Sequence, residues 1–175
     1  MQNIYWISLF SAIFYILVPK CLDLIKTTTY LLEKATLIST ICLVLIVLLQ
    51  IFARFFLADA PAWTEEASRI FFIYAISFGA GLALKDNYYV QMDLLFEQLS
   101  DKAKFYLELI TLLSVLALFG LFLWHSIAFF QMGLVETSPS LKIPMAVTFA
   151  SMIILSASLC FYVIVELRKL ILLHR

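Results

Sequence analysis

Four long apolar runs without a charged residue constrain what this chain can fold into. They cover residues 35–53, 70–84, 109–135 and 143–165. Hydrocarbon about 30 Å thick is crossed by about 20 helical residues, each rising about 1.5 Å. The second run has only 15 residues, so we expect its helix to include the turns from Trp63 to Arg69. The sequence therefore predicts an all-α membrane protein with a core of four transmembrane helices.

The overall composition agrees with this class and excludes others. The chain is 64% hydrophobic and 14% charged, whereas soluble domains average about 45–50% and about 25%. Its 12 basic and 12 acidic residues give no net charge, so nothing favours a nucleic-acid partner. Three cysteines and two histidines are too few, and too scattered, for a disulfide or zinc framework. We expect neither a metal site nor a cofactor.

The N-terminal segment is apolar but ambiguous. Residues 1–19 carry no charge and are long enough to cross a bilayer. No basic residue precedes this stretch and no Ala-x-Ala site follows it, which argues against a cleaved signal peptide. Its aromatic residues suit either a helix lying in the interface or an additional span. We divide the chain into an N-terminal apolar segment, residues 1–30, and a four-helix membrane domain, residues 31–175.

The distribution of Lys and Arg predicts the orientation of the four-helix core. Nine of these residues lie in segments 20–34 and 85–104 and in the C-terminal tail, and three lie on the opposite side. Because positive charge marks the cytoplasmic side, we expect both flanks of the core in the cytoplasm. Loops 54–64 and 131–143 then face outward.

The segment between the second and third runs has an amphipathic pattern. In residues 88–100, Asp93 and Glu97 fall on one helical face, and apolar residues can form another. This pattern is typical of a helix along the cytoplasmic interface. A surface that docks a partner is the alternative. Asp93 is the candidate residue for organising this connector.

A charged cluster lies between the first two runs and consists of Arg54, Trp63, Glu65, Glu66 and Arg69. Charges beside the bilayer interior usually pair with one another or serve a function. The three-residue spacing predicts a pair between Glu66 and Arg69, and Arg54 should lie within reach of Glu65. Gln50 precedes Arg54 by one turn and can share its face. The cluster indicates either a salt-bridged hairpin at the outer interface or a surface for a partner.

Small residues recur along the second run at a spacing of four. Ala75, Gly79 and Ala83 form one series, and Ser77 with Gly81 adds a second pair. Small residues at this spacing let helix backbones approach closely inside lipid. Packing within the four-helix unit and packing against another subunit are both consistent with this pattern.

The sequence contains no pattern typical of catalysis. It lacks a Walker loop, paired intramembrane carboxylates and a Ser/His/Asp set, so we expect no enzyme activity. His125 follows Trp124 near the end of the third run, which favours interfacial packing over a role as a ligand. Neither paired broken helices nor inverted repeats are evident, so we do not expect one copy to form a complete carrier.

Several short motifs, taken in order, resemble a known family. Gln50 and Arg54 end the first span, and Trp63 to Arg69 open the second. Phe78-Gly79-Ala80, Val90 to Asp93 and Ser138 to Pro144 follow at matching positions. Over about residues 31–165 the chain resembles the small, DctQ-type membrane subunit of tripartite ATP-independent periplasmic (TRAP) transporters. It departs from the usual pattern at Tyr89, where the family commonly has His, and at Gln50, where Asn is frequent.

This resemblance implies a supporting role in the bacterial inner membrane. A large DctM-type subunit would hold the sodium and substrate sites, and a soluble periplasmic protein would deliver an organic acid to it. The substrate classes include C4-dicarboxylates, sialic acid and other acidic sugars, of which we select sialic acid as the prediction. An unrelated four-helix scaffold, or the membrane anchor of a redox enzyme, is the alternative. The candidate structural or partner-interface residues are Gln50, Arg54, Trp63, Glu65, Glu66, Arg69, Gly79 and Asp93.

Overall fold

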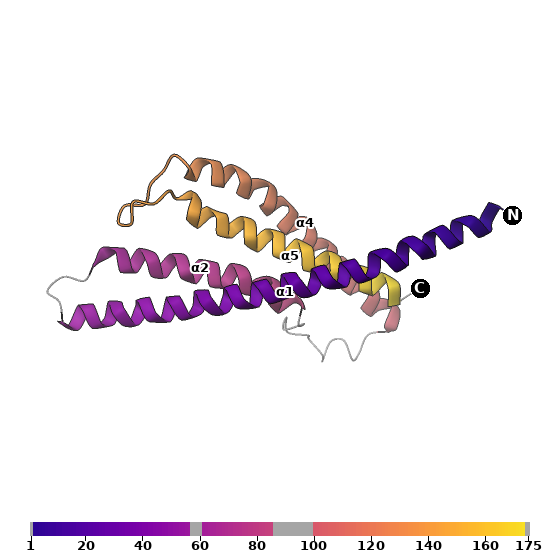
Figure 1. Cartoon of the computed structure of the whole chain (residues 1–175), viewed down its shortest axis with the longest axis horizontal. Helices are drawn as coiled ribbons and strands as arrows, with labels where there is room; N and C mark the ends of the chain where they lie inside the picture. Colours follow the sequence, from indigo (N-terminus) through magenta and orange to yellow (C-terminus); the bar gives the residue numbers. More distant parts are fainter. Residues whose placement is uncertain (1, 57–60, 86–99, 174–175) are drawn as a thin grey trace.

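The computed structural model describes residues 2–56, 61–85 and 100–173, and within these ranges the chain is almost entirely helical. The helices are α1 (Gln2–Phe56), α2 (Ala62–Lys85), α4 (Asp101–Gly133) and α5 (Ala146–Leu173) (Figure 1). Each contains a stretch long and apolar enough to cross a membrane. The prediction of an all-α membrane protein with four spans is confirmed. The predicted amphipathic connector, with Asp93, lies outside the described residues apart from Ser100.

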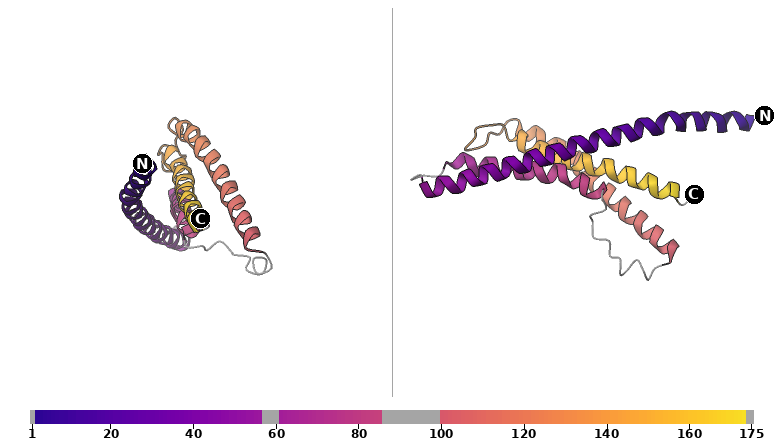
Figure 2. Two further views of the ribbon diagram at one scale, coloured as in Figure 1. Left: turned by 90° about the vertical axis from the view of Figure 1, so that its right-hand side faces the viewer. Right: turned by 60° about the horizontal axis from the view of Figure 1, so that its bottom comes forward.

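Helix α1 differs from the expectation of a separate N-terminal helix. It runs without interruption for 55 residues, a length of about 83 Å. Its candidate membrane span is Leu24–Phe56, and the preceding part extends beyond the other helices (Figure 2). The N-terminal segment is thus continuous with the first span instead of forming a separate helix. Its two predicted placements, along the interface or across the membrane, stay predictions.

The helices pack in the order α1, α2, α5, α4. Helix α1 packs on α2, α2 on α5, and α5 on α4. Two hairpins, α1–α2 and α4–α5, are thus joined through their second helices. Figures 1 and 2 show α1 and α4 on opposite sides, with α2 and α5 between them. The central α5 is the most buried of the spans, whereas few side chains are fully buried in α4 and in residues 24–56 of α1.

Small residues explain why the two hairpins meet closely. The buried positions of α2 are Thr64, Ala67, Ser77 and Gly81. A Cβ atom on Gly81 would lie 2.9 Å from the Cβ of Ser158 in α5, so these backbones approach as closely as glycine allows. The Ser158 hydroxyl donates to the Leu155 carbonyl oxygen, 3.0 Å away in its own helix. Small side chains with satisfied hydroxyls suit a helix contact in lipid.

Two tyrosines connect neighbouring helices through hydrogen bonds. The hydroxyl of Tyr162 in α5, 1% exposed, lies 2.9 Å from the Thr29 hydroxyl in α1. The Tyr74 hydroxyl in α2 donates to the Val147 carbonyl oxygen at the beginning of α5, 2.6 Å away. A buried phenol needs such a partner. These bonds add directional contacts between helices to packing that rests largely on small side chains.

The chain reverses direction at one common end of both hairpins. Helix α1 ends and α2 begins there, and so do α4 and α5 (Figure 1). We call this the outer end, following the orientation predicted from Lys and Arg. Between α4 and α5, a Cβ on Gly133 would lie 2.5 Å from the Ala146 nitrogen. Glycine is therefore required for the close approach of the last turn of α4 to the first turn of α5.

Candidate functional site

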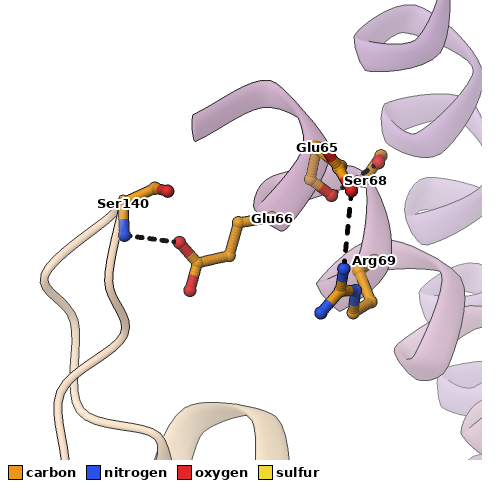
Figure 3. Close-up of polar contacts among 5 residues, drawn as sticks. All are labelled: Glu65, Glu66, Ser68, Arg69 and Ser140. Carbon is orange, nitrogen blue, oxygen red and sulfur yellow. Dashed lines mark hydrogen bonds and ion pairs between the residues drawn. The ribbon is translucent and has the colours of Figure 1, made fainter. Parts of the chain in front are cut away.

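The outer end brings together two segments whose contacting residues are 74 and 75 positions apart in the sequence. Glu66, in the second turn of α2, extends toward the loop between α4 and α5 (Figure 3). Its Oε2 atom accepts hydrogen bonds from the backbone nitrogens of Ser140 and Leu141, each 3.0 Å away. We call this contact the Glu66 clasp. It fastens the first hairpin to the tip of the second.

The loop that Glu66 holds, residues 134–145, is a compact structure. The Ser138 nitrogen donates to the Ile143 carbonyl oxygen at 2.8 Å, and the Met145 nitrogen donates to the Glu136 carbonyl oxygen at 2.9 Å. Near the tip, Lys142 has a φ of 53°, a left-handed conformation that is uncommon for residues other than glycine. These bonds form a narrow reversal whose tip presents two backbone N–H groups to one carboxylate.

Ser138 lies beneath this tip. Its side chain is 4% exposed and its hydroxyl lies beside the Glu66 carboxylate. Within the described ranges, no partner meets this hydroxyl with the geometry of a hydrogen bond. The two backbone N–H groups of the clasp therefore carry the contact between Glu66 and the loop.

Glu65 and Arg69 form a separate pair on another side of α2. Arg69 Nη2 lies 3.6 Å from Glu65 Oε1, and both side chains are about two-thirds exposed. Figure 3 shows this pair turned away from the clasp. The predicted ion pair between Glu66 and Arg69 is therefore not formed, although residues three apart on a helix are close enough to pair. The Glu66 carboxylate instead turns to the loop tip, and Arg69 lies against Glu65, one turn earlier.

The structure does not join the remaining cluster members to these contacts. Arg54 is exposed in the last turn of α1, where its charge suits the negative end of the helix dipole. No ion pair between Arg54 and Glu65 occurs in the described part of the chain, contrary to our expectation. Gln50, one turn earlier, is half-buried, and Trp63, at the beginning of α2, is 43% exposed. Their role at a partner interface stays a prediction.

The small residues of α2 divide between two neighbours. A Cβ on Gly79 would lie 3.6 Å from Thr36 Cγ2 in α1, an ordinary contact distance. A Cβ on Gly81 has no such space, because it would lie 2.9 Å from the Cβ of Ser158 in α5. The tightest position is therefore Gly81, facing α5, rather than the candidate Gly79. Both contacts lie within the four-helix unit.

Sequence reasoning missed the loop tip and the two tyrosines. The contact that the two backbone N–H groups of residues 140 and 141 make with Glu66 corresponds to no signature in the sequence. Tyr74 and Tyr162 do have one, because a phenol inside an otherwise apolar span must find a hydrogen-bond partner. No three His, Cys, Asp or Glu side chains in the described ranges are grouped to hold a metal ion.

The chain is similar to known transporter components. The family model of the DctQ component of tripartite ATP-independent periplasmic transporters matches residues 43–173. A putative TRAP transporter small permease protein of Haemophilus influenzae is 24% identical over 147 residues, 82% of this chain and 89% of that protein. The isethionate TRAP transporter permease protein DctMQ of Oleidesulfovibrio alaskensis is 30% identical over 89 residues, 50% of this chain but only 14% of that protein.

The family match covers α2, α4 and α5 completely, together with residues 43–56 at the outer end of α1. It includes both segments joined by the Glu66 clasp. The expected resemblance is confirmed over most of the chain. This multi-pass membrane protein belongs to the DctQ family, a family of transporter components rather than of enzymes.

Proposed function

We propose that this chain is the small membrane subunit of a TRAP transporter and supports a large DctM-type subunit. The observation that carries this proposal is the open arrangement of the helices. They lie side by side, and their apolar side chains are exposed along α1 and α4. Such a unit encloses little interior of its own, which suits a lipid-embedded support packed against a second membrane protein.

The Glu66 clasp supports this role. A brace must keep its hairpins in fixed positions, and in lipid the hydrophobic effect does not hold helices together. The clasp fastens the two hairpins at the outer end, and the Thr29–Tyr162 hydrogen bond joins α1 to α5 nearer the other end. Contacts at both ends resist sliding and splaying of the helices.

We further propose sodium-coupled uptake of an organic acid delivered by a periplasmic binding protein. The predicted orientation in the bacterial inner membrane places the clasped loop on the periplasmic side, where that protein would arrive. One relative is named for isethionate, which is a small organic acid. Sialic acid is the first substrate to test, with C4-dicarboxylates, acidic sugars and isethionate as comparisons.

Co-purification and reconstitution test the proposal. The affinity-tagged chain, extracted from its native membrane, should retain a large polytopic subunit. Both subunits and the binding protein, placed in vesicles with a sodium gradient, should take up labelled acid, and omission of any one should abolish uptake. Transport by this chain alone would contradict a supporting role. A haem absorbance band in the purified complex would instead favour the redox anchor.

The charged cluster allows a finer test. Arg54→Ala or Glu65→Ala should lower retention of the large subunit or the rate of uptake, and should leave the preference among acids unchanged. The physical reason is that substrate contacts belong to the other subunit. A changed substrate preference would place this chain at the substrate site and contradict the proposed division of roles.

A further inference from the structure

An exposed stripe of residues on α2 includes two charged side chains next to the apolar run that crosses the membrane. Five residues at helical spacing, with steps of three and four, are all exposed: Ala62, Glu65, Arg69, Phe72 and Ile76. At about 100° per residue they fall within a narrow sector. The buried residues Ala67, Ser77 and Gly81 lie on the opposite sector. The stripe therefore points away from the packed interior of the described helices.

The length of α2 places this charge pair near hydrocarbon. The uncharged run from Ile70 to Leu84 has 15 residues, or about 22 Å of helix. The hydrocarbon core is about 30 Å thick. A charged group at one end of this run must therefore lie close to the apolar layer. Arg69 is at the outer end, on the exposed stripe.

Arg69 retains donors that its own helix does not use. Its contact with Glu65 is 3.6 Å long, beyond the usual range of a hydrogen bond. A guanidinium group has five N–H donors, and the described residues accept no hydrogen bond from them. Charged side chains within a span almost always face protein or a water-filled cavity, where acceptors are available.

Helix α4 provides the contrast. Its exposed positions include Ile110, Leu118, Leu121 and Phe122, and the chain carries no charge from Leu109 to Val135. These apolar side chains are satisfied by lipid tails alone, and the exposed His125 lies in the half of α4 nearer the outer end. The stripe on α2 therefore requires hydrogen-bond acceptors for Arg69, whereas the apolar side chains exposed on α4 require only lipid.

We infer that the stripe of Glu65, Arg69, Phe72 and Ile76 is the surface that docks the large membrane subunit, while α4 faces lipid. This inference rests on the proposed function and assigns the partner to one helix face. The large subunit would present a carboxylate or amide oxygen to Arg69 in the outer half of the membrane. Apolar side chains one and two turns deeper would cover Phe72 and Ile76.

Photo-cross-linking in native membranes tests this assignment. A photoreactive phenylalanine replaces Phe72 or Ile76, and matched control variants carry it at Leu118 or Leu121, which are similarly exposed. The α2 positions should give adducts with the large subunit, and the α4 positions should give adducts with lipid. Adducts from α2 to lipid only, or to a second copy of this chain, would overturn the inference, as would large-subunit adducts from α4 alone.

A charge variant provides the second measurement. Arg69→Gln should reduce the large subunit retained on the tagged chain at least about tenfold, because an acceptor on the partner loses its charged donor. Lys169→Gln, which changes the exposed pair of Lys169 with Glu166 in α5, should leave retention unchanged. The opposite pattern would overturn the inference.

The unmodified chain shows whether the proposed function fails or only the assignment of the α2 stripe fails. If it does not retain a large subunit, the proposed function fails. If it does retain one, but the partner cross-links through another face or is insensitive to Arg69, only the assignment of the α2 stripe fails.

Discussion

At the scale of single residues, two adjacent carboxylates have different surroundings. Glu66 accepts two backbone hydrogen bonds from the loop tip, whereas Glu65 meets only the exposed Arg69. Bonds from backbone N–H groups to a carboxylate are charge-assisted and are stronger than neutral ones. An exposed ion pair contributes little to stability. Both residues carry the same carboxylate, and their positions on the helix determine which partners they contact.

We therefore expect Glu66→Ala to loosen the outer loop and Glu65→Ala to leave it intact. Trypsin can cleave after Lys142, within the loop that Glu66 holds, and its rate reports local opening. In the isolated small subunit, Glu66→Ala should speed this cleavage and lower the thermal midpoint. Glu65→Ala is the matched control. Equal rates in both variants would show that the clasp does not hold the loop.

Lys142 allows a test of backbone strain. Its φ of 53° disfavours side chains branched at Cβ, and a left-handed conformation costs about 1–2 kcal/mol for an ordinary residue. Lys142→Val should therefore be less stable than Lys142→Gly by about that amount, measured by thermal unfolding in detergent. Indistinguishable midpoints would mean that the loop adopts another conformation in solution.

At the scale of elements, the helices are joined by small residues and by a few hydrogen bonds. Gly81 is closely approached by α5, while Gly79 has ordinary space beside α1. We expect Gly81→Ala to lower the free energy of unfolding by about 1–3 kcal/mol through overpacking. Gly79→Ala should be neutral or slightly stabilising, because Ala favours a helix more than Gly does. A larger loss from Gly79→Ala would reverse this assignment.

The hydrogen bond between Tyr162 and Thr29 should contribute modestly. Such bonds between membrane helices average about 0.6 kcal/mol and reach about 1.7 kcal/mol. Tyr162→Phe should destabilise the protein by an amount in this range. A double-mutant cycle with Thr29→Val isolates the coupling between the two hydroxyls. Purely additive losses would indicate that the hydroxyls do not interact.

At the scale of the whole molecule, the arrangement in the order α1, α2, α5, α4 separates two kinds of surface. The contacts between hairpins lie in the middle, and the apolar edges lie on α1 and α4. A closed bundle would have hidden more of each helix. The open arrangement leaves surface for a partner and for lipid, which is what a supporting subunit requires.

The orientation of the whole chain can be tested by labelling. After Cys21, Cys42 and Cys160 are replaced by Ala, a single cysteine is introduced as Ser140→Cys or Lys102→Cys. A membrane-impermeant maleimide added to intact spheroplasts should label the first variant and should label the second only after permeabilisation. The physical reason is the excess of Lys and Arg on the cytoplasmic side. The reverse labelling would invert the proposed orientation.

The sequence by itself determined the class of this protein and its spans. Uncharged runs long enough to cross hydrocarbon can satisfy their backbone only as helices, so the four spans follow from composition along the chain. The short second run correctly indicated that α2 begins before Arg69. The ordered motifs also identified the family, since they survive as local patterns.

Only the tertiary structure decided which residues meet. Glu66 reaches Ser140, 74 positions away, and Tyr162 reaches Thr29, 133 positions away. Such pairs depend on the rotation and order of the helices, which local spacing does not specify. The continuity of α1 through residues 20–34 is also decided there, because a helix can pass through charges that a count of apolar residues treats as a boundary. The pattern of residues along the chain determines which segments become spanning helices, and the packing of those helices determines which side chains come into contact.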